Sequence, residues 1–265
     1  MITRAEVEKL GAIHAITPAV LSLYVAVPAL PWQLSDLAVH ARELIAAAET
    51  VVGGPGNLSE EDRNGALEVL ADEAREWPGR TVAIFACADV GLLEAVPLPR
   101  AMPDRAVLGI RPHIRPLLAA LQRCPAHVAI ADEGHVSQSV IGLQACLAAV
   151  NAGAAETLVV PRDGLVAGYE CGRCGALGTD TDGCPDWGTA PLQVPDVIEE
   201  MVSRVLEDGG EVLVTSDPSY PIAARLHSPA TGEETASASG GTWLVRQFGM
   251  ERGRLGRCGR DAPGG

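Results

Sequence analysis

The chain has 265 residues, of which 47% are apolar and 20% charged, so it can bury a core over one or two domains. This composition excludes a wholly disordered chain and a collagen-like one. The net charge of −14 opposes nonspecific binding to nucleic acid phosphates. No apolar run approaches the roughly 18–20 residues of a membrane helix, and the acidic N-terminus lacks the pattern of a secretory signal. We therefore expect a soluble, cytoplasmic protein.

Residues 1–134 are expected to form an α/β domain that contains a helical hairpin. Thr3 and Glu6 form a capping box, which predicts a first helix that ends near His14. Two further helices joined by a glycine-rich loop are predicted to be antiparallel, the second of them capped by Ser59. Strands are predicted on either side of this pair, from β-rich segments bounded by proline, glycine or aspartate. In chain order after the first helix, the predicted elements are a strand over 20–27, helices over 35–50 and 59–77, and paired strands over 81–87 and 92–98.

The second half of the chain alternates helix and strand, which favours a layered α/β domain over residues 137–250. We expect a long stretch without periodicity over 164–191 and mostly loop over 216–241. The remaining predicted elements are helices over 112–122, 138–151 and 195–207 and strands over 127–132, 156–160, 211–215 and 242–248. The sequence thus predicts two layered α/β domains.

The last residues, 251–265, form a basic segment in an otherwise acidic chain. Arg252, Arg254, Arg257 and Arg260 are candidates for local contact with RNA phosphates. The alternative interpretation is a solvated, disordered tail that ends in Gly-Gly.

Three cysteines have the pattern of a zinc ribbon. Cys171 and Cys174 form a complete C-x-x-C-G knuckle, and Cys184 begins a second one. Trp187 occupies the position of the fourth sulfur, and tryptophan does not ligate zinc. Candidates to complete the site are Asp180, Asp182, Asp186, His227 and Cys258, and the sequence does not choose among them. We expect structural zinc here, or else a loop that keeps this shape without metal.

Patterns for catalysis are weak. The chain has no Gly-x-Ser-x-Gly elbow, no P-loop and no dinucleotide-binding fingerprint. Asp132, Glu133 and His135 cluster carboxylates with an imidazole, so an enzyme such as a small-molecule hydrolase could use them as acid and base. A solvated turn at the end of a strand is the alternative.

Taken in order, several segments resemble the bacterial branch of the archaeo-eukaryotic peptide-chain release factor family, which also includes Pelota. The resemblance depends on the order of these segments, and on a Glu-Thr-Leu-Val-Val strand that is followed by the cysteine loop. The segments are 20–25, 82–91, 97–103, 111–118, 127–132, 140–160, 196–200 and 240–248. The resemblance implies an N-terminal domain with a helical hairpin and a C-terminal, ribosomal-protein-like α/β/α sandwich. Most of the family's central domain is missing.

Two departures bear on function. The family hydrolyses peptidyl-tRNA with a Gly-Gly-Gln motif, and no Gly-Gly here precedes glutamine. The family reads codons with an Asn-Ile-Lys-Ser motif, whereas this chain has no lysine after Lys9. The resemblance therefore implies a non-catalytic binding protein that contacts the ribosome or a translation factor. The alternatives are an enzyme at residues 132–135 or a decayed paralogue without activity.

Overall fold

The computed structural model describes residues 2–17, 19–29, 34–52, 57–99, 101–122, 139–180, 191–216 and 221–227. These residues belong to one compact unit, which spans residues 1–228. The unit mixes helices and sheets, as the sequence predicts, and the α/β class is confirmed. The division into two domains near residue 134 is not confirmed.

The first sheet has four antiparallel strands in the order β3-β2-β1-β4. Its strands are β1 (Val20–Ala26), β2 (Thr81–Cys87), β3 (Leu92–Leu98) and β4 (Arg105–Gly109). The β2–β3 hairpin turns through a short 3-10 helix, η2 (Ala88–Val90), and the left-handed Gly91. Both strands of the hairpin have the bounds that the sequence predicts.

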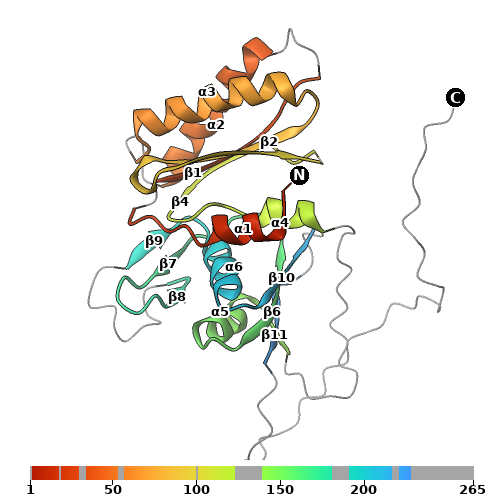
Figure 1. Ribbon diagram of the computed structural model, residues 1–265. Helices are drawn as coiled ribbons and strands as arrows, with labels where there is room; N and C mark the ends of the chain where they lie inside the picture. The colour runs from red at the N-terminus through yellow and green to blue at the C-terminus, as the bar shows by residue number, and fades with distance from the viewer. Residues whose placement is uncertain are drawn as a thin grey trace, which may run out of the picture. The chain divides into compact units, whose positions relative to one another are not determined.

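A helical hairpin covers one face of this sheet (Figure 1). It consists of α2 (Leu34–Val51) and α3 (Glu60–Glu76), and the Ser59 hydroxyl caps α3 by accepting from the backbone N–H of Asp62. Side chains alternate along β2, so that Val82, Ile84 and Ala86 pack against the hairpin in a closed core. The predicted hairpin is confirmed.

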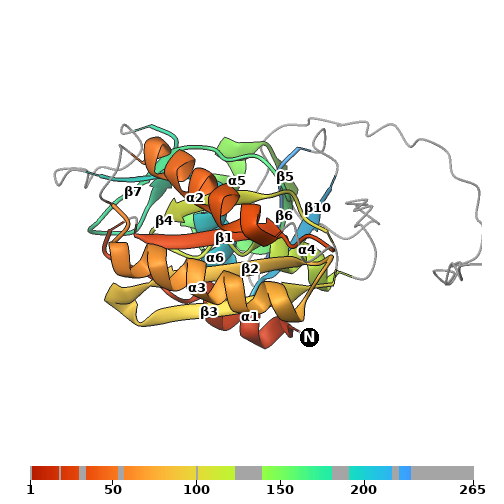
Figure 2. The same ribbon diagram turned by 90° about the horizontal axis from the view of Figure 1, so that it is seen from above.

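The opposite face of the first sheet packs against α1 (Arg4–Gly11) and α4 (Arg115–Leu121) (Figure 1). The predicted capping box is present, since the Thr3 hydroxyl accepts from the backbone of Glu6 and the Glu6 carboxylate accepts from the backbone of Thr3. Seen from above, α1 lies beside β3, at the edge of the sheet (Figure 2).

The second sheet has the strand order β10-β6-β11-β5. Strands β6 and β10 are parallel, and the other two pairs are antiparallel. Its strands are β5 (Ser139–Ile141), β6 (Ala155–Pro161), β10 (Glu211–Thr215) and β11 (Ala223–Leu226). Helices α5 (Leu143–Asn151) and α6 (Val197–Glu207) pack against it, and the apolar stripe of α6 is buried.

A third, small sheet has the order β8-β7-β9 and contains the cysteine knuckle. Its strands are β7 (Gly168–Glu170), β8 (Leu177–Gly178) and β9 (Leu192–Val194). The Asn151 side chain at the end of α5 attaches β8, because its amide donates to the Leu177 carbonyl and accepts from the Leu177 N–H.

One apolar core joins the first sheet to the second. It extends from Val7 of α1 through Phe85 of β2 and Ile114 to Val202 of α6 and Ala224 of β11. Residues from both halves of the chain therefore bury one another, and this places the polar residues between the two sheets in a closed environment.

Several predictions of local structure were wrong. The helix predicted over 138–151 begins only at Leu143, because residues 139–141 pair with β11 as a strand, and Gly142 turns between them with φ of 98°. The stretch over 164–191 contains β7 and β8, and β4 and β11 were not predicted. The strands predicted over 127–132 and 242–248 lie outside the described residues.

Within the part of the chain that the structure describes, no helix is long and apolar enough to span a membrane.

Candidate functional site

A cluster of ionisable side chains lies between the first sheet and α6. His113 and Arg115 follow β4, where the chain enters α4, and Asp196 and Glu199 stand at the start of α6. All four are buried, with at most 5% of each residue exposed. Asp196 is placed there by its role as the N-cap of α6, since its carboxylate accepts from the backbone N–H of Ile198.

Arg115 binds both carboxylates of this cluster. Its Nε lies 3.0 Å from a Glu199 oxygen, and its terminal nitrogen pairs with Asp196. Two further guanidinium protons are donated to the carbonyls of Pro161 and Gly164 at 2.8 Å. This buried guanidinium therefore links α4 to β6, to the segment after β6 and to α6.

His113 completes the cluster from the side of the first sheet. Its backbone N–H donates to the Ser22 hydroxyl at 2.8 Å, and its carbonyl accepts from the Tyr24 hydroxyl. Its ring Nδ1 lies 2.9 Å from a Glu199 oxygen. These contacts connect β1 directly to α6.

The pKa values of the two carboxyl groups move in opposite directions. Burial raises the pKa of Asp196 above its ordinary value, although Arg115 opposes the shift. Burial also acts to raise the pKa of Glu199, but the charges of His113 and Arg115 and the hydrogen bonds to this carboxylate outweigh it and hold the pKa below the ordinary value.

This cluster has metal-ligand chemistry, but an arginine already binds its two carboxylates. Ligand atoms of His113, Asp196 and Glu199 lie within 4.8 Å of one another. However, the Arg115 guanidinium already binds both carboxylates, and a divalent ion there would stand beside a fixed positive charge. The side chains are also sealed from solvent, so a substrate would reach them only if the core opened. We interpret the cluster as a polar link between elements.

A second ionic group joins α6 to the end of α1. Arg111 contacts Glu200 at 3.1 Å, pairs with Glu207 and donates to the Gly11 carbonyl at 3.2 Å. The contact between Arg111 Nε and Glu200 lacks hydrogen-bond alignment. Burial raises the pKa of Glu200 to about 8, with Arg111 opposing and other carboxylates adding to the shift.

The cysteine knuckle forms the turn between β7 and β8. The Cys171 N–H donates to the Ala176 carbonyl at 2.9 Å, and the Gly175 N–H donates to the Cys171 carbonyl at 2.7 Å. Gly175 has φ of +70°, which glycine adopts without strain. Cys171 is buried and Cys174 exposed on the same turn, and neither forms a disulfide. The structure thus places two of the three predicted zinc ligands together.

Other predicted site residues lie outside the described part of the chain. These are the third knuckle cysteine Cys184, the junction residues Asp132, Glu133 and His135, and the tail arginines Arg252, Arg254, Arg257 and Arg260. His227 is described, and its backbone N–H donates to Ala154 at the start of β6. No group of three ligands among the described residues contains His227 or the knuckle cysteines.

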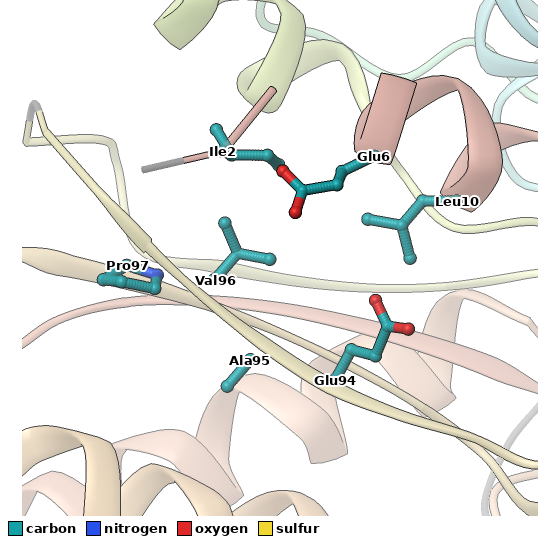
Figure 3. A pocket seen from close by; sticks show the side chains of 7 residues that line it. All are labelled: Ile2, Glu6, Leu10, Glu94, Ala95, Val96 and Pro97. Carbon is teal, nitrogen blue, oxygen red and sulfur yellow. The ribbon is translucent and has the colours of Figure 1, made fainter. Parts of the chain in front are cut away.

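A groove of about 310 Å³ opens between α1 and β3 (Figure 3). Ile2 and Leu10 line it from α1 and its approach, and Val96 lines it from β3. The carboxylates of Glu6 and Glu94, one from each element, point into the space between α1 and β3 (Figure 3). The groove is therefore lined by apolar side chains and by two carboxylates.

Sequence reasoning did not find the buried cluster. Its members are far apart in the chain, at 113–115 and 196–199, and nothing local in the sequence indicates that the two segments meet. The available signal was a His-x-Arg sequence directly before a helix, together with an acidic N-cap, since such charges are buried only when paired.

Comparisons with known proteins add little here. No protein-family profile and no curated protein matches the chain. Among solved structures, a chain titled "Archaeal protein" is similar, with 12% identity and a TM-score of 0.32, over 87% of this chain and 99% of that chain. A TM-score this low supports no inference, so function is argued from the residues themselves.

Proposed function

We propose that this protein is a non-catalytic, release-factor-like binding protein of the translation apparatus, without stop-codon reading or peptidyl-tRNA hydrolysis. Its partner is a basic ribosomal protein or translation factor. The resemblance in the sequence supports the class, and the missing Gly-Gly-Gln and Asn-Ile-Lys-Ser motifs argue against catalysis and codon reading.

The observation that carries the proposal is the charge on the α2–α3 hairpin. Exposed carboxylates far outnumber exposed cations on these helices. The carboxylates are Asp36, Glu43, Glu60, Glu61, Glu68, Asp72 and Glu76, and the cations are Arg42 and Arg75. A surface of this sign repels RNA phosphates and attracts basic protein segments, so the partner is expected to be protein.

The proposal is tested by sedimentation of the tagged protein with ribosomes through sucrose gradients at low and high salt. We expect co-migration with ribosomal particles at low salt and its loss at high salt, because exposed charges are screened. Protein that stays at the top of both gradients would refute ribosome association.

A charge-reversal variant separates this surface from the general acidity of the chain. Glu61 and Glu68 lie two turns apart on one face of α3, so Glu61→Arg with Glu68→Arg should abolish co-migration. The matched control, Asp208→Arg with Glu211→Arg, makes the same change of charge at exposed positions after α6 and should co-migrate as the wild type does. Equal behaviour of the two variants would show that the hairpin is not the binding surface.

We also propose that Cys171, Cys174 and Cys184 hold a structural zinc ion. The knuckle supports this, because it turns two thiols onto one loop and thiolates are the ligands that zinc prefers. Purified protein is expected to contain zinc by elemental analysis and to lose it in the Cys174→Ser variant. Cys146→Ser is the control, since burial raises the pKa of that thiol to about 11 and it lies apart, in α5.

The alternative of an enzyme at Asp132, Glu133 and His135 stays a hypothesis, and so does the hypothesis of a decayed paralogue. The first predicts a loss of any measured activity in Asp132→Asn. The second predicts no partner in the sedimentation experiment.

A further inference from the structure

Strand β3 forms one edge of the first sheet. It pairs with β2 along its whole length, from Leu92 opposite Cys87 to Leu98 opposite Thr81, and with no other strand that the structure describes. The backbone groups on its outer side are therefore available for another strand, except at Pro97, which has no N–H to donate.

Side chains along β3 alternate between two faces. Leu93 is half exposed and packs beside Gly65 of α3, whereas Glu94 and Val96 point toward α1. An extended segment added at the edge would place every second side chain in the groove beneath β3, between Val96 on one side and Ile2 and Leu10 on the other. The groove therefore lies where alternate side chains of an added strand would point.

Two carboxylates decide which segments fit. The Glu94 side chain makes no hydrogen bond or ion pair within the described part of the chain, although its backbone belongs to the ladder with β2. Glu6 uses one carboxylate oxygen for the backbone and hydroxyl of Thr3, at 2.7 and 2.9 Å, and leaves the other oxygen open. A purely apolar strand laid on this edge would cover both charges without a partner, which is unfavourable. A segment with one cation between apolar residues would neutralise them.

We propose that the α1–β3 groove binds an extended, basic segment of a partner protein, which adds to the first sheet at β3 and places a lysine or arginine between Glu6 and Glu94. This inference goes beyond the proposed function, because it requires neither the ribosome nor the α2–α3 surface. A second copy of this chain is a poorer occupant. It carries the same net charge of −14 and would bring another Glu94 to this edge.

The test uses a fluorescent heptapeptide, Thr-Val-Thr-Arg-Thr-Val-Thr, which matches the seven residues of β3. Its valines and arginine share one face and its threonines share the other. We expect saturable binding to the full-length protein by fluorescence anisotropy, and slower hydrogen exchange at the β3 amides. Replacing the peptide arginine by glutamate should abolish binding. No binding of the arginine peptide up to about 1 mM, which corresponds to a negligible affinity, would overturn the proposal.

Backbone pairing is tested with N-methylated peptides. Methylation of alternate amides blocks one edge of the peptide only, so one alternation should abolish binding and the other should preserve it. Equal binding of the two methylated peptides would overturn strand addition.

Protein variants test the carboxylates. Glu94→Gln should weaken binding about tenfold, the loss expected for one charge-assisted hydrogen bond, and Glu94→Arg should weaken it further. Glu43→Gln removes the same charge on α2 and should bind as the wild type does. Unchanged affinity in Glu94→Gln would overturn the proposal. So would a dimer of the wild type, seen by light scattering, that the peptide dissociates, because the occupant would then be a second copy.

Discussion

At the scale of single residues, Arg115 is the side chain on which the buried cluster depends. It is the cation that binds both Asp196 and Glu199, and it also satisfies the carbonyls of Pro161 and Gly164. The His113 ring also lies near both carboxylates, but the two carbonyls are bound by Arg115 and not by His113. Removal of the guanidinium would therefore leave two buried carboxylates and two carbonyls without their partner.

We predict that Arg115→Leu lowers the free energy of unfolding by about 3–5 kcal/mol, measured by urea denaturation at pH 7, because it breaks a buried ion pair on one side. Arg4→Leu is the control. It removes an exposed pair with Glu8 at 2.7 Å on α1 and should cost less than about 1 kcal/mol. A similar cost for both variants would show that the cluster does not stabilise the fold.

Glu200 is predicted to make stability depend on pH. The unfolded chain loses this proton near its ordinary pKa of 4.5, whereas the folded chain keeps it to about 8. Between these values the unfolded state binds fewer protons, so the Glu200 contribution makes the free energy of unfolding fall as pH rises.

Glu200→Gln should remove that fall, so its stability relative to the wild type should increase from pH 5 to pH 9. Thermal unfolding over this range measures the difference. Glu207→Gln is the control, because it removes the other carboxylate that pairs with Arg111, from a side chain that is 41% exposed. Parallel profiles for Glu200→Gln and the wild type would contradict the assignment.

At the scale of elements, the small third sheet is held against α6 by a close approach at Gly168. A Cβ added there would lie 2.6 Å from the Gly178 carbonyl oxygen and 2.7 Å from Val197 Cβ. Both neighbours are backbone or stiff side chain, so neither yields easily.

Gly168→Ala should therefore destabilise the protein by about 1–3 kcal/mol, the usual cost of overpacking. Gly172→Ala, in the cysteine knuckle that follows β7, meets nothing within 4 Å and should be close to neutral. Chemical denaturation of the two variants measures the difference. Equal stability would mean that β7 does not pack on α6 as closely as described.

At the scale of the whole molecule, the shared core predicts cooperative folding of residues 1–228. Because Val7 and Phe85 pack in the same cluster as Val202 and Ala224, neither half buries its apolar surface alone. The slowest-exchanging amides of β2 and β6 should then open with the same free energy in native-state hydrogen exchange. Two well-separated opening energies would instead support independent domains divided near residue 134.

The local elements of the first 98 residues were determined by the sequence itself. Thr3 with Glu6 and Ser59 cap their helices, and the β-rich composition and bounding turns of 81–87 and 92–98 define the β2–β3 hairpin. The period of apolar residues and the capping residues are local patterns, so they can be recognised in the sequence before the fold is known. The C-x-x-C-G knuckle is local in the same sense.

Only the tertiary structure decided the rest. Residues 139–141 are a strand because β11, more than 80 residues later, pairs with them, and no local preference encodes that partner. The buried cluster needs His113, Arg115, Asp196 and Glu199 to meet across the junction of α4 and α6. The α1–β3 groove likewise joins Glu6 to Glu94. Whether a charge is buried and which strand forms the edge of a sheet both depend on how distant segments pack together. Local sequence patterns therefore do not reveal them.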